Sequence, residues 1–344
     1  MAVGIVKDNI YLEHITDDFH PESPRRLAHI YEMLKHIDQE NLAYIPPRMA
    51  THEEIALIHE PSYIDSIAQT SGKAHTYLDG DTATSAKTYE AACKAVGGVF
   101  ELADALQSSR VDSGFALVRP PGHHAERSNA MGFCIFNNIA IVARYLQQKH
   151  HLKNILIVDF DIHHGNGTQH SFYADKSVLY FSTHLYPHYP GTGWFEEIGK
   201  GDGVGYTVNV PMGHSMCDED YLYSFRDVLL PISDIFAPEM VLVSAGFDAH
   251  HMDPLGGMAL TESGYAAMTR MLLNIAEKHC NGKALFVLEG GYDLKGLTDS
   301  VKAVIMELKR QPLYPHVKTG EPSASLVQMT TSLKRLLIPY WGHF

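Results

Sequence analysis

The chain has 344 residues, of which 45% are hydrophobic and 19% charged, and its formal net charge at pH 7 is −13. This length and composition are typical of a globular protein with one large α/β domain or two smaller ones. The acidic balance argues against nucleic acid as a direct partner, because binding to a phosphate backbone requires clustered Lys and Arg. The acidic balance mildly favours a cationic substrate. A general role of the negative charge in solubility explains the balance equally well.

No targeting or membrane signal is evident in the sequence. The opening residues MAVGIVKDNI lack the basic region and long apolar segment of a secretory signal. No stretch reaches the roughly 18 apolar residues that a membrane span needs. The 4 cysteines are scattered without CxxC spacing, which predicts free thiols in a reducing compartment. We therefore expect a cytoplasmic protein without membrane association.

Short apolar runs alternate with longer segments of helical periodicity. In chain order, we predict a helix after Pro24, helices at 52–59 and 85–107, a strand at 115–118, a helix at 137–149, strands at 155–160, 178–182 and 206–210, a helix at 218–235, a strand at 240–246, a helix at 262–279, a strand at 284–288, and helices at 296–309 and about 324–338. This alternation predicts a doubly wound, mostly parallel α/β sheet with helices on both faces. No linker interrupts the pattern, so we expect residues 1–344 to form a single domain with a docked C-terminal helix.

Three ligand-type side chains follow the apolar run 155–158 at alternate positions: Asp159, Asp161 and His163. Residues two apart in extended chain project to the same side. Polar residues are common at strand ends, but carboxylates that follow a buried run directly would be costly to bury without a partner. Asp248, which follows another predicted strand, is placed to join Asp161 and His163. Two carboxylates and an imidazole with an open position suit a divalent cation that activates water for hydrolysis.

Adjacent histidines, His123 and His124, follow a Pro-Pro-Gly turn. As general bases they need partners that orient their second ring nitrogens, and Asp159 and Asn166 are the natural candidates. Tyr292, after a Gly-Gly pair, has a donor hydroxyl that suits stabilisation of the oxyanion in a tetrahedral intermediate. Taken alone, Tyr292 is equally compatible with a turn tyrosine packed on the surface.

The sequence resembles the arginase/deacetylase superfamily, and within it the class II histone deacetylases and bacterial histone-deacetylase-like amidohydrolases. The motifs that carry the resemblance run in order from His20 to Asp293: HPESPRR, RPPGHHAE, GFCIFNN, VDFDIHHGNGTQ, YPGTG, SAGFDAH, DPLGG and LEGGYD. It implies the arginase/deacetylase fold. It also implies hydrolytic removal of an acetyl or another short acyl group from the side-chain amine of acyl-lysine in proteins or peptides.

The resemblance implies a role for each candidate residue. The ligands of one Zn²⁺ per chain would be Asp161, His163 and Asp248. The catalytic residues would be His123, His124, Tyr292, Asp159 and Asn166. The walls of a narrow channel for the acyl-amine chain would include Gly132, Phe133, Tyr189 and Leu255. Structural K⁺ or Na⁺ ions would be bound by main-chain oxygens around 159–163 together with Ser182, and nearer Phe172.

Two details of the resemblance bear on activity. Asn166 stands where class I enzymes have a second aspartate, which is usual in class II. Tyr292 matches the family's catalytic tyrosine, which some class II members replace by histidine, so its presence predicts ordinary deacetylase activity. Aromatic walls would bury the methylene groups of a lysine whose acetylated, uncharged end tolerates a dry interior.

Three alternatives remain at this point. An acetylpolyamine amidohydrolase fits the acidic balance, but polyamine-selective relatives tend to place a carboxylate where this chain has Leu255. A non-catalytic acyl-lysine reader would be expected to have lost a metal ligand or Tyr292, and none is missing. A manganese ureohydrolase would need more carboxylates to bridge two metals than these motifs provide.

Overall fold

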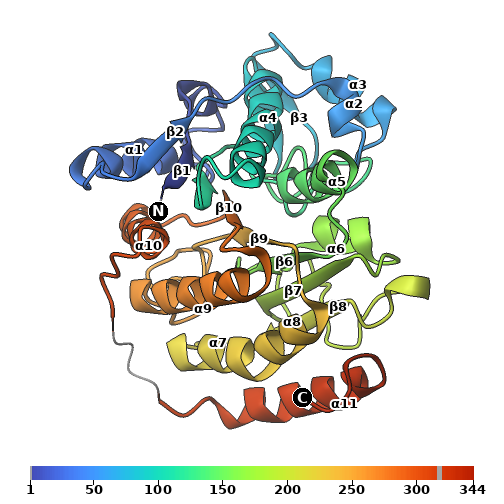
Figure 1. Ribbon diagram of the computed structural model, residues 1–344. Coiled ribbons are helices and arrows are strands. Elements are labelled where there is room, and N and C mark those ends of the chain that lie inside the picture. Colours follow the sequence, from blue (N-terminus) through green and yellow to red (C-terminus); the bar gives the residue numbers. More distant parts are fainter. Residues whose placement is uncertain (1, 316–319) are drawn as a thin grey trace.

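The computed structural model describes residues 2–315 and 320–344. Its centre is an 8-stranded parallel sheet with the strand order β2-β1-β5-β10-β9-β6-β7-β8 (Figure 1). Its strands are β1 (Val3–Val6), β2 (Leu42–Ile45), β5 (Ser113–Ala116), β6 (Ile155–Asp159), β7 (Val178–Leu185), β8 (Thr207–Met212), β9 (Met240–Ala245) and β10 (Ala284–Leu288). An antiparallel hairpin, β3 (His75–Tyr77) and β4 (Ala83–Ser85), forms a separate small sheet.

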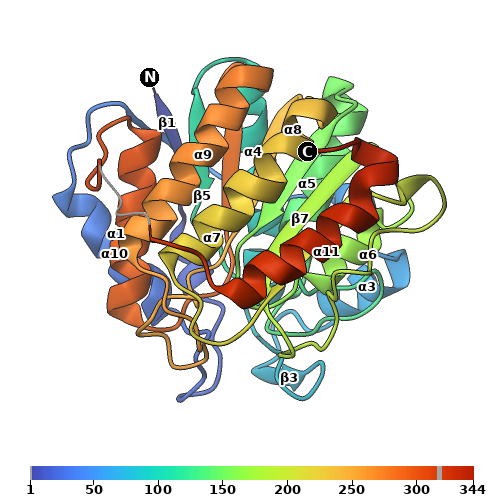
Figure 2. The ribbon, with the colours of Figure 1, turned by 90° about the horizontal axis from the view of Figure 1, so that it is seen from below.

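Helices cover both faces of the large sheet. Helices α4 (Thr88–Gln107) and α5 (Asn138–His150) lie on one face, and α9 (Glu262–Cys280) and α10 (Leu294–Leu308) lie on the other (Figure 2). The remaining helices are α1 (Arg25–His36), α2 (His52–Ile55), α3 (Pro61–Ala68), α6 (Asn166–Phe172), α7 (Asp218–Ser224), α8 (Leu230–Phe236) and α11 (Ala324–Trp341). A π-helical turn at Phe225–Leu229 joins α7 to α8. This arrangement confirms the predicted doubly wound α/β fold.

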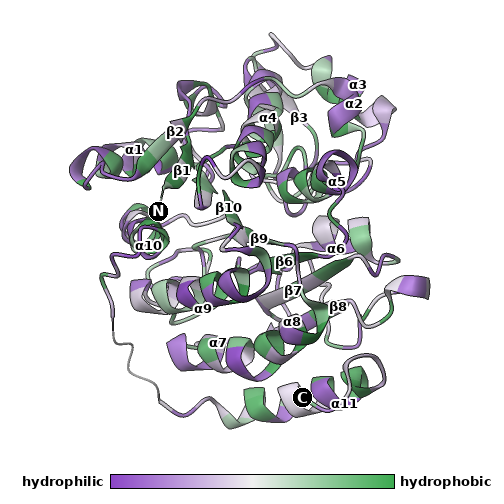
Figure 3. Ribbon diagram, in the orientation of Figure 1, coloured by the Kyte–Doolittle hydropathy of each residue, from purple (hydrophilic) through white to green (hydrophobic). Residues whose placement is uncertain are grey.

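The hydropathy of the elements explains the layering. Strands β5, β6, β9 and β10 are buried along their whole length and consist mainly of apolar residues. Continuous apolar runs are what parallel strands require when helices cover both faces. The surrounding helices are apolar on one side and polar on the other (Figure 3). In the described part of the chain, no helix is both long and apolar enough to cross a membrane.

The short elements differ from the sequence prediction. Strands β1 and β2 and helices α3 and α6 were not predicted, and the strand predicted at 115–118 begins two residues earlier. Four-residue strands are too short to show a period, and β2 at the sheet edge is only partly buried. The helix predicted at 52–59 contains the short α2, and an irregular turn separates it from α3.

Helix α11 lies beside the edge strand β8. Its apolar residues Leu326, Leu333 and Leu337 are buried. Trp341 donates a hydrogen bond from Nε1 to the Gly205 carbonyl over 2.7 Å, and its ring packs on Tyr206 and Phe236. The C-terminal helix predicted near 324–338 is therefore present, and it extends three residues further.

Candidate active site

The candidate residues follow the four central strands, which are neighbours in the sheet. Their positions are His123 and His124 after β5, Asp161 and His163 after β6, Asp248 after β9, and Tyr292 after β10. Because the strands are parallel, all of these segments leave the sheet at the same edge, where ligands bind in doubly wound folds. Residues that are far apart in the chain therefore form one site.

A buried cluster consists of Asp161, His163 and Asp248, whose ligand atoms all lie within 4.8 Å of one another. His163 Nδ1 is 3.0 Å from Asp161 Oδ1 and 3.2 Å from Asp248 Oδ2. The intervening Phe160 and Ile162 are fully buried in the apolar core. The alternation expected for extended chain thus separates ligand-type side chains from core side chains.

The chemistry of this cluster fits a divalent cation. Asp248 Oδ2 is buried without a hydrogen-bond partner in the described structure, while Oδ1 accepts from the Ile162 amide over 2.9 Å. A single proton on His163 Nδ1 cannot neutralise both nearby carboxylates, and unpaired buried charge is costly. A Cβ at Gly290 would lie 2.2 Å from Asp248 Oδ2, so glycine keeps the space open. Two carboxylates and one imidazole are a donor set that suits zinc.

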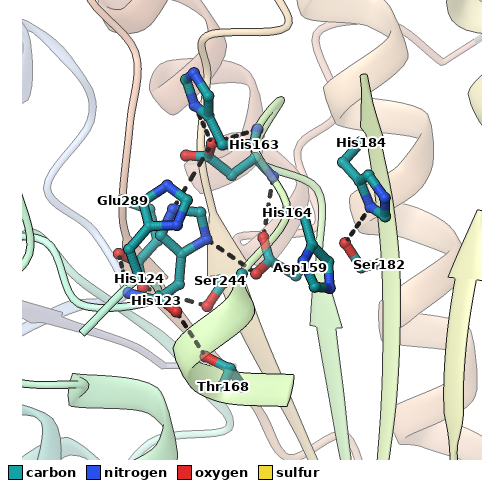
Figure 4. Close-up of polar contacts among 12 residues, drawn as sticks. His123, His124, Asp159, His163, His164, Thr168, Ser182, His184, Ser244 and Glu289 are labelled. Atoms are coloured by element: carbon teal, nitrogen blue, oxygen red, sulfur yellow. Dashed lines mark hydrogen bonds and ion pairs between the residues drawn. The ribbon is translucent and has the colours of Figure 1, made fainter. Parts of the chain in front are cut away.

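The two adjacent histidines have different partners. His123 Nδ1 lies 3.1 Å from Asp159 Oδ2, and the Tyr180 hydroxyl donates to the same oxygen over 3.1 Å. His124 Nδ1 lies 2.7 Å from Asn166 Oδ1. The two imidazole rings are tilted by 44° with their centroids 4.0 Å apart (Figure 4). One histidine is therefore paired with a carboxylate and the other with a neutral amide.

These environments move the two pKa values apart. Burial acts to lower the pKa of His123, but the carboxylates of Asp159 and Asp161 outweigh it and raise the pKa to about 10. Burial lowers the pKa of His124 well below its usual value, and the positive charges of His123 and His163 lower it further. His123 therefore favours the charged form and His124 the neutral form.

A cavity of about 190 Å³ opens onto this cluster. Its lining residues are Asp81, His124, Gly132, Phe133, His163, His188, Tyr189, Leu255 and Tyr292. The Tyr189 ring meets His124 edge to face at 5.1 Å, and Phe133 meets Tyr292 in the same way at 5.9 Å. All four residues expected to form a channel wall thus surround one cavity, and Tyr292 lies beside them.

Burial raises the pKa of Tyr292 well above its usual value, and the charge of Asp248 raises it further. The hydroxyl therefore stays protonated and available as a donor. Its backbone is held by Asp253, whose Oδ2 accepts from the amides of Tyr292 over 2.6 Å and Asp293 over 3.0 Å. The same carboxyl group accepts the Leu255 amide through Oδ1 over 3.0 Å, so it connects two parts of the cavity wall.

The sequence prediction missed a buried polar network behind Tyr292. Arg26 donates from Nε to the Gly291 carbonyl over 2.6 Å and from Nη2 to the Glu289 carbonyl over 2.5 Å. Its Nη1 donates to Glu22 over 3.0 Å, and Glu22 also pairs with Arg119. The sequence did contain one indication that Arg26 is buried. Arg26 lies four residues before Ile30, so the two side chains share the apolar face of α1.

Glu289 was also missed as a functional candidate. Its Oε2 accepts from the amides of Gly122 over 2.7 Å and His123 over 3.2 Å. Its Oε1 accepts from the Ser244 hydroxyl over 3.2 Å. Burial raises the pKa of Glu289 to about 7, although the charge of His123 opposes this shift. The carboxyl group therefore holds the turn that presents the two histidines.

Two residues of the cavity wall, Asp81 and His188, had no predicted role. The Gly132 amide donates to Asp81 Oδ1 over 3.2 Å, and His188 stacks edge to face with His163 at 5.2 Å. Neither lies in a strand or in a motif with ligand spacing, so no local pattern indicated them. Ser182, expected near a monovalent cation, pairs with Asp159 in the register of β6 and β7, and its hydroxyl contacts His184 over 2.9 Å.

Comparison with known proteins agrees with this geometry. The histone deacetylase domain family matches residues 20–308. A "Probable deacetylase" of Archaeoglobus fulgidus is 40% identical over 86% of this chain and 83% of its own length. "Histone deacetylase 15" of Arabidopsis thaliana is 40% identical over 94% of this chain, and "Polyamine deacetylase HDAC10" of Danio rerio is 38% identical over 94%. The chain spans 59% and 49% of these two longer relatives.

A solved structure supports the same assignment. The crystal structure of the HDA15 HD domain superposes with a TM-score of 0.92 at 38% sequence identity. The match covers 99% of this chain and 95% of that one. The family match extends over most of the sequence and includes every segment that contributes to the cavity. The chain therefore belongs to the histone deacetylase family.

Proposed function

We propose that this protein is a zinc-dependent deacetylase that hydrolyses the acetyl amide, or another short acyl amide, on the side chain of acyl-lysine in peptides or proteins. One observation carries the proposal: the Asp161, His163 and Asp248 cluster lies at a cavity with apolar aromatic walls and two differently paired histidines. The family relatives named as deacetylases support the same reaction class.

Asp161, His163 and Asp248 would hold the metal ion. When bound there, a zinc ion supplies Lewis-acid activation of the amide carbonyl and lowers the pKa of water. The three side chains come from loops after two rigid neighbouring strands, β6 and β9. Gly290 donates its amide to Asp161 Oδ2 over 2.9 Å, which orients that carboxylate. We expect one metal ion per chain.

The residues around the metal position would move the protons. His124 favours the neutral form and is suited to accept the proton of the attacking water as a general base. The positive charge that Asp159 stabilises on His123 suits the developing negative charge of the tetrahedral intermediate. The Tyr292 hydroxyl would donate to the same oxyanion. The proton taken by His124 would then pass to the leaving amine.

The cavity wall favours a neutral aliphatic chain. Phe133 and Tyr189 line the cavity with aromatic rings that would bury lysine methylenes, and the missing side chain of Gly132 leaves room beside His124 and Tyr189. Leu255 contributes an apolar group at the position where polyamine-selective relatives tend to have a carboxylate. These features favour acyl-lysine over a substrate with further positive charges along its chain.

Acetylpolyamine hydrolysis is the second candidate function. Asp81 supplies a carboxylate to the cavity wall, and the zebrafish relative is named a polyamine deacetylase. The net charge of −13 would also attract a polycation. The two candidate functions share the same amide hydrolysis and differ in the amine part of the substrate, which is a lysine side chain in one and a polyamine in the other.

Acetate release from an acetyl-lysine peptide and from acetylputrescine tests the proposal, with protein that carries one equivalent of zinc. We expect faster turnover of the peptide, and we expect the Tyr292→Phe variant to lose most of it without losing zinc. Faster turnover of acetylputrescine would favour the second candidate. Absence of turnover with either substrate, or an unimpaired Tyr292→Phe variant, would contradict the proposed mechanism.

The cellular setting is also a proposal. The 4 cysteines, Cys93, Cys134, Cys217 and Cys280, are free thiols in the structure. Free thiols suit a reducing compartment, so we propose a cytoplasmic enzyme. Fractionation of cells that express the protein, followed by immunodetection, checks this location.

A further inference from the structure

Asn166, the partner of His124, is held from both ends of its amide. Its Oδ1 lies 2.7 Å from His124 Nδ1. Its Nδ2 donates to Glu126 Oε1 over 2.5 Å. The Asn166 side chain is buried, so water does not replace either contact readily. The side-chain amide of Asn166 therefore connects His124 to the carboxylate of Glu126.

The surroundings of Asn166 Nδ2 determine which way the amide points. The three neighbouring groups are Glu126 Oε1, the His124 carbonyl at 3.3 Å and the Met131 sulfur at 3.4 Å. All three are acceptors, and Glu126 is the strongest because it is an anion. The NH₂ end must face them, which leaves the oxygen end for His124.

This orientation decides the tautomer of His124. An amide oxygen is only an acceptor, so His124 Nδ1 must carry a proton and donate it to Asn166. In a neutral imidazole, Nε2 then has the free lone pair. If the amide were reversed, its NH₂ would favour the opposite tautomer, with the proton on Nε2. Such a ring could not accept a proton from water.

Glu126 is itself well placed for this role. His170, on α6, contacts Glu126 Oε1 through Nδ1 over 2.8 Å. Burial acts to raise the pKa of Glu126, but the contacts from His170 and Asn166 outweigh it and hold the pKa below its usual value. Glu126 is therefore anionic near neutral pH. The two residues that it contacts lie on one helix, one turn apart.

We propose that Glu126 is a positioning residue for deacetylation, because it fixes the Asn166 amide and thereby holds His124 in the tautomer that has a free Nε2. The inference rests on the proposed function of His124 as the base. It also explains how a neutral asparagine serves at this position. An aspartate there would need no such partner, since its two oxygens are equivalent.

Replacement of Glu126 by methionine tests the inference, because methionine has similar length and no strong acceptor. We expect kcat with the acetyl-lysine peptide to fall about 10- to 100-fold, while KM and zinc content stay unchanged. Long-range ¹H–¹⁵N spectra of histidine-labelled protein should show His124 shifting from the Nδ1-protonated to the Nε2-protonated form. This second readout does not depend on turnover.

Two matched variants separate positioning from general damage. Glu126→Gln keeps an oxygen acceptor for Asn166 and should retain most of kcat. Arg127→Met changes the adjacent residue, which lines the same surface cavity as Glu126 and His170 without contacting Asn166. Its turnover and its His124 spectrum should match those of the unmodified protein.

A double variant gives the sharpest result. In an Asn166→Asp background the amide is gone, so Glu126→Met should cause no further loss of kcat. An equal loss in both backgrounds, or an unchanged His124 tautomer in Glu126→Met, would overturn the inference. Failure of the proposed function is distinguishable from these results, because the unmodified protein would then turn over neither substrate.

Discussion

Gly132 shows how one residue can decide the shape of the cavity. Its φ of +58° lies in the left-handed region, where glycine is favoured. A Cβ there would come within 2.4 Å of His124 Cδ2 and 3.0 Å of Tyr189 Cε1. Contacts this short require the histidine or the channel wall to move. The close approach of this loop to His124 therefore depends on the absence of a side chain at Gly132.

Gly132→Ala should reduce kcat/KM for the acetyl-lysine peptide by at least tenfold, because the added methyl group would displace His124. A tenfold loss corresponds to about 1.4 kcal/mol in the activation free energy. Gly72→Ala is the matched control, because Gly72 also has a positive φ, of 78°, but open space around its Cβ position. Both variants lose about 1 kcal/mol of stability to backbone strain. Equal activity of the two variants would show that the contact with His124 does not matter.

Asp248 is the residue on which the proposed metal binding depends most clearly. Its buried Oδ2 shares His163 Nδ1, 3.2 Å away, with the carboxylate of Asp161, so a bound cation is what would balance the second negative charge. Asp248→Asn keeps the shape and removes the charge. We expect zinc content, measured by atomic emission after dialysis, to fall from one per chain to a small fraction.

The control for this experiment is Asp253→Asn. Asp253 accepts hydrogen bonds from backbone amides and is not part of the proposed metal site, so its variant should keep its zinc. Chelation of zinc from the unmodified protein should lower the thermal midpoint, because a ligand that binds only the folded state stabilises it. The Asp248→Asn variant should show little response to the chelator.

At the scale of elements, helix α1 is joined to the loop after β10 by one arginine. Arg26 is fully buried, and its guanidinium binds the carbonyls of Glu289 and Gly291 and lies 5.1 Å from the centre of the Tyr292 ring. The Tyr31 hydroxyl of the same helix contacts the Asp8 backbone and does not reach this loop. The pairing therefore couples the stability of the fold to the position of Tyr292.

Arg26→Met should lower the free energy of unfolding by about 3–5 kcal/mol, because it leaves the buried Glu22 with one fewer cationic partner and two carbonyls without donors. Arg25→Met, on the exposed side of the same helix, should change it by less than about 0.5 kcal/mol. Urea denaturation of both variants provides the measurement. A small effect in Arg26→Met would mean that water or another residue replaces the guanidinium.

At the scale of the whole molecule, buried neutral histidines make stability depend on pH. His59 Nδ1 contacts the Glu126 carbonyl over 2.9 Å, and its Nε2 accepts from the Asn137 amide over 2.8 Å. A backbone N–H cannot become an acceptor, so protonation of Nε2 breaks this contact. Burial lowers the pKa of His59 to about 4, and it lowers the pKa of His184 to the same value.

The sign of the effect follows from these pKa values. Unfolded histidine titrates near pH 6.5, so between about pH 6.5 and 4 the unfolded chain binds protons that the folded protein excludes. Stability is therefore complete above this window and falls as the pH falls through it. Each histidine contributes at most about 3 kcal/mol to the loss.

Urea midpoints measured from pH 7.5 to 4.5 test this dependence. His59→Gln keeps an acceptor for the Asn137 amide and cannot be protonated, so its stability should fall less steeply with decreasing pH. Parallel curves for the variant and the unmodified protein would show that His59 does not contribute. Carboxylates also titrate in the lower part of this pH range. The difference between His59→Gln and the unmodified protein therefore isolates the contribution of His59.

The sequence by itself determined the features that depend on local order. Alternation of Asp159, Asp161 and His163 after an apolar run follows from the geometry of extended chain, and the parallel sheet follows from the alternation of strands and helices. Together with the position of Asp248 after another strand, these patterns were enough to predict that Asp161, His163 and Asp248 lie together. The long helices and the strands β6, β9 and β10 were predicted close to their observed bounds for the same reason.

The sequence indicated Asp159 and Asn166 as partners of the two histidines, and only the tertiary structure decided which further groups surround the site. Arg26 meets Gly291 across 265 positions of sequence, and Glu126 meets Asn166 across 40. The periodicity of apolar residues in the sequence does not predict such contacts, because they arise where separate loops converge at one edge of the sheet. Strands β1 and β2 were missed because four residues are too few to show a pattern. Local spacing thus indicates the candidate ligand residues, whereas the orientation of their side chains depends on long-range packing.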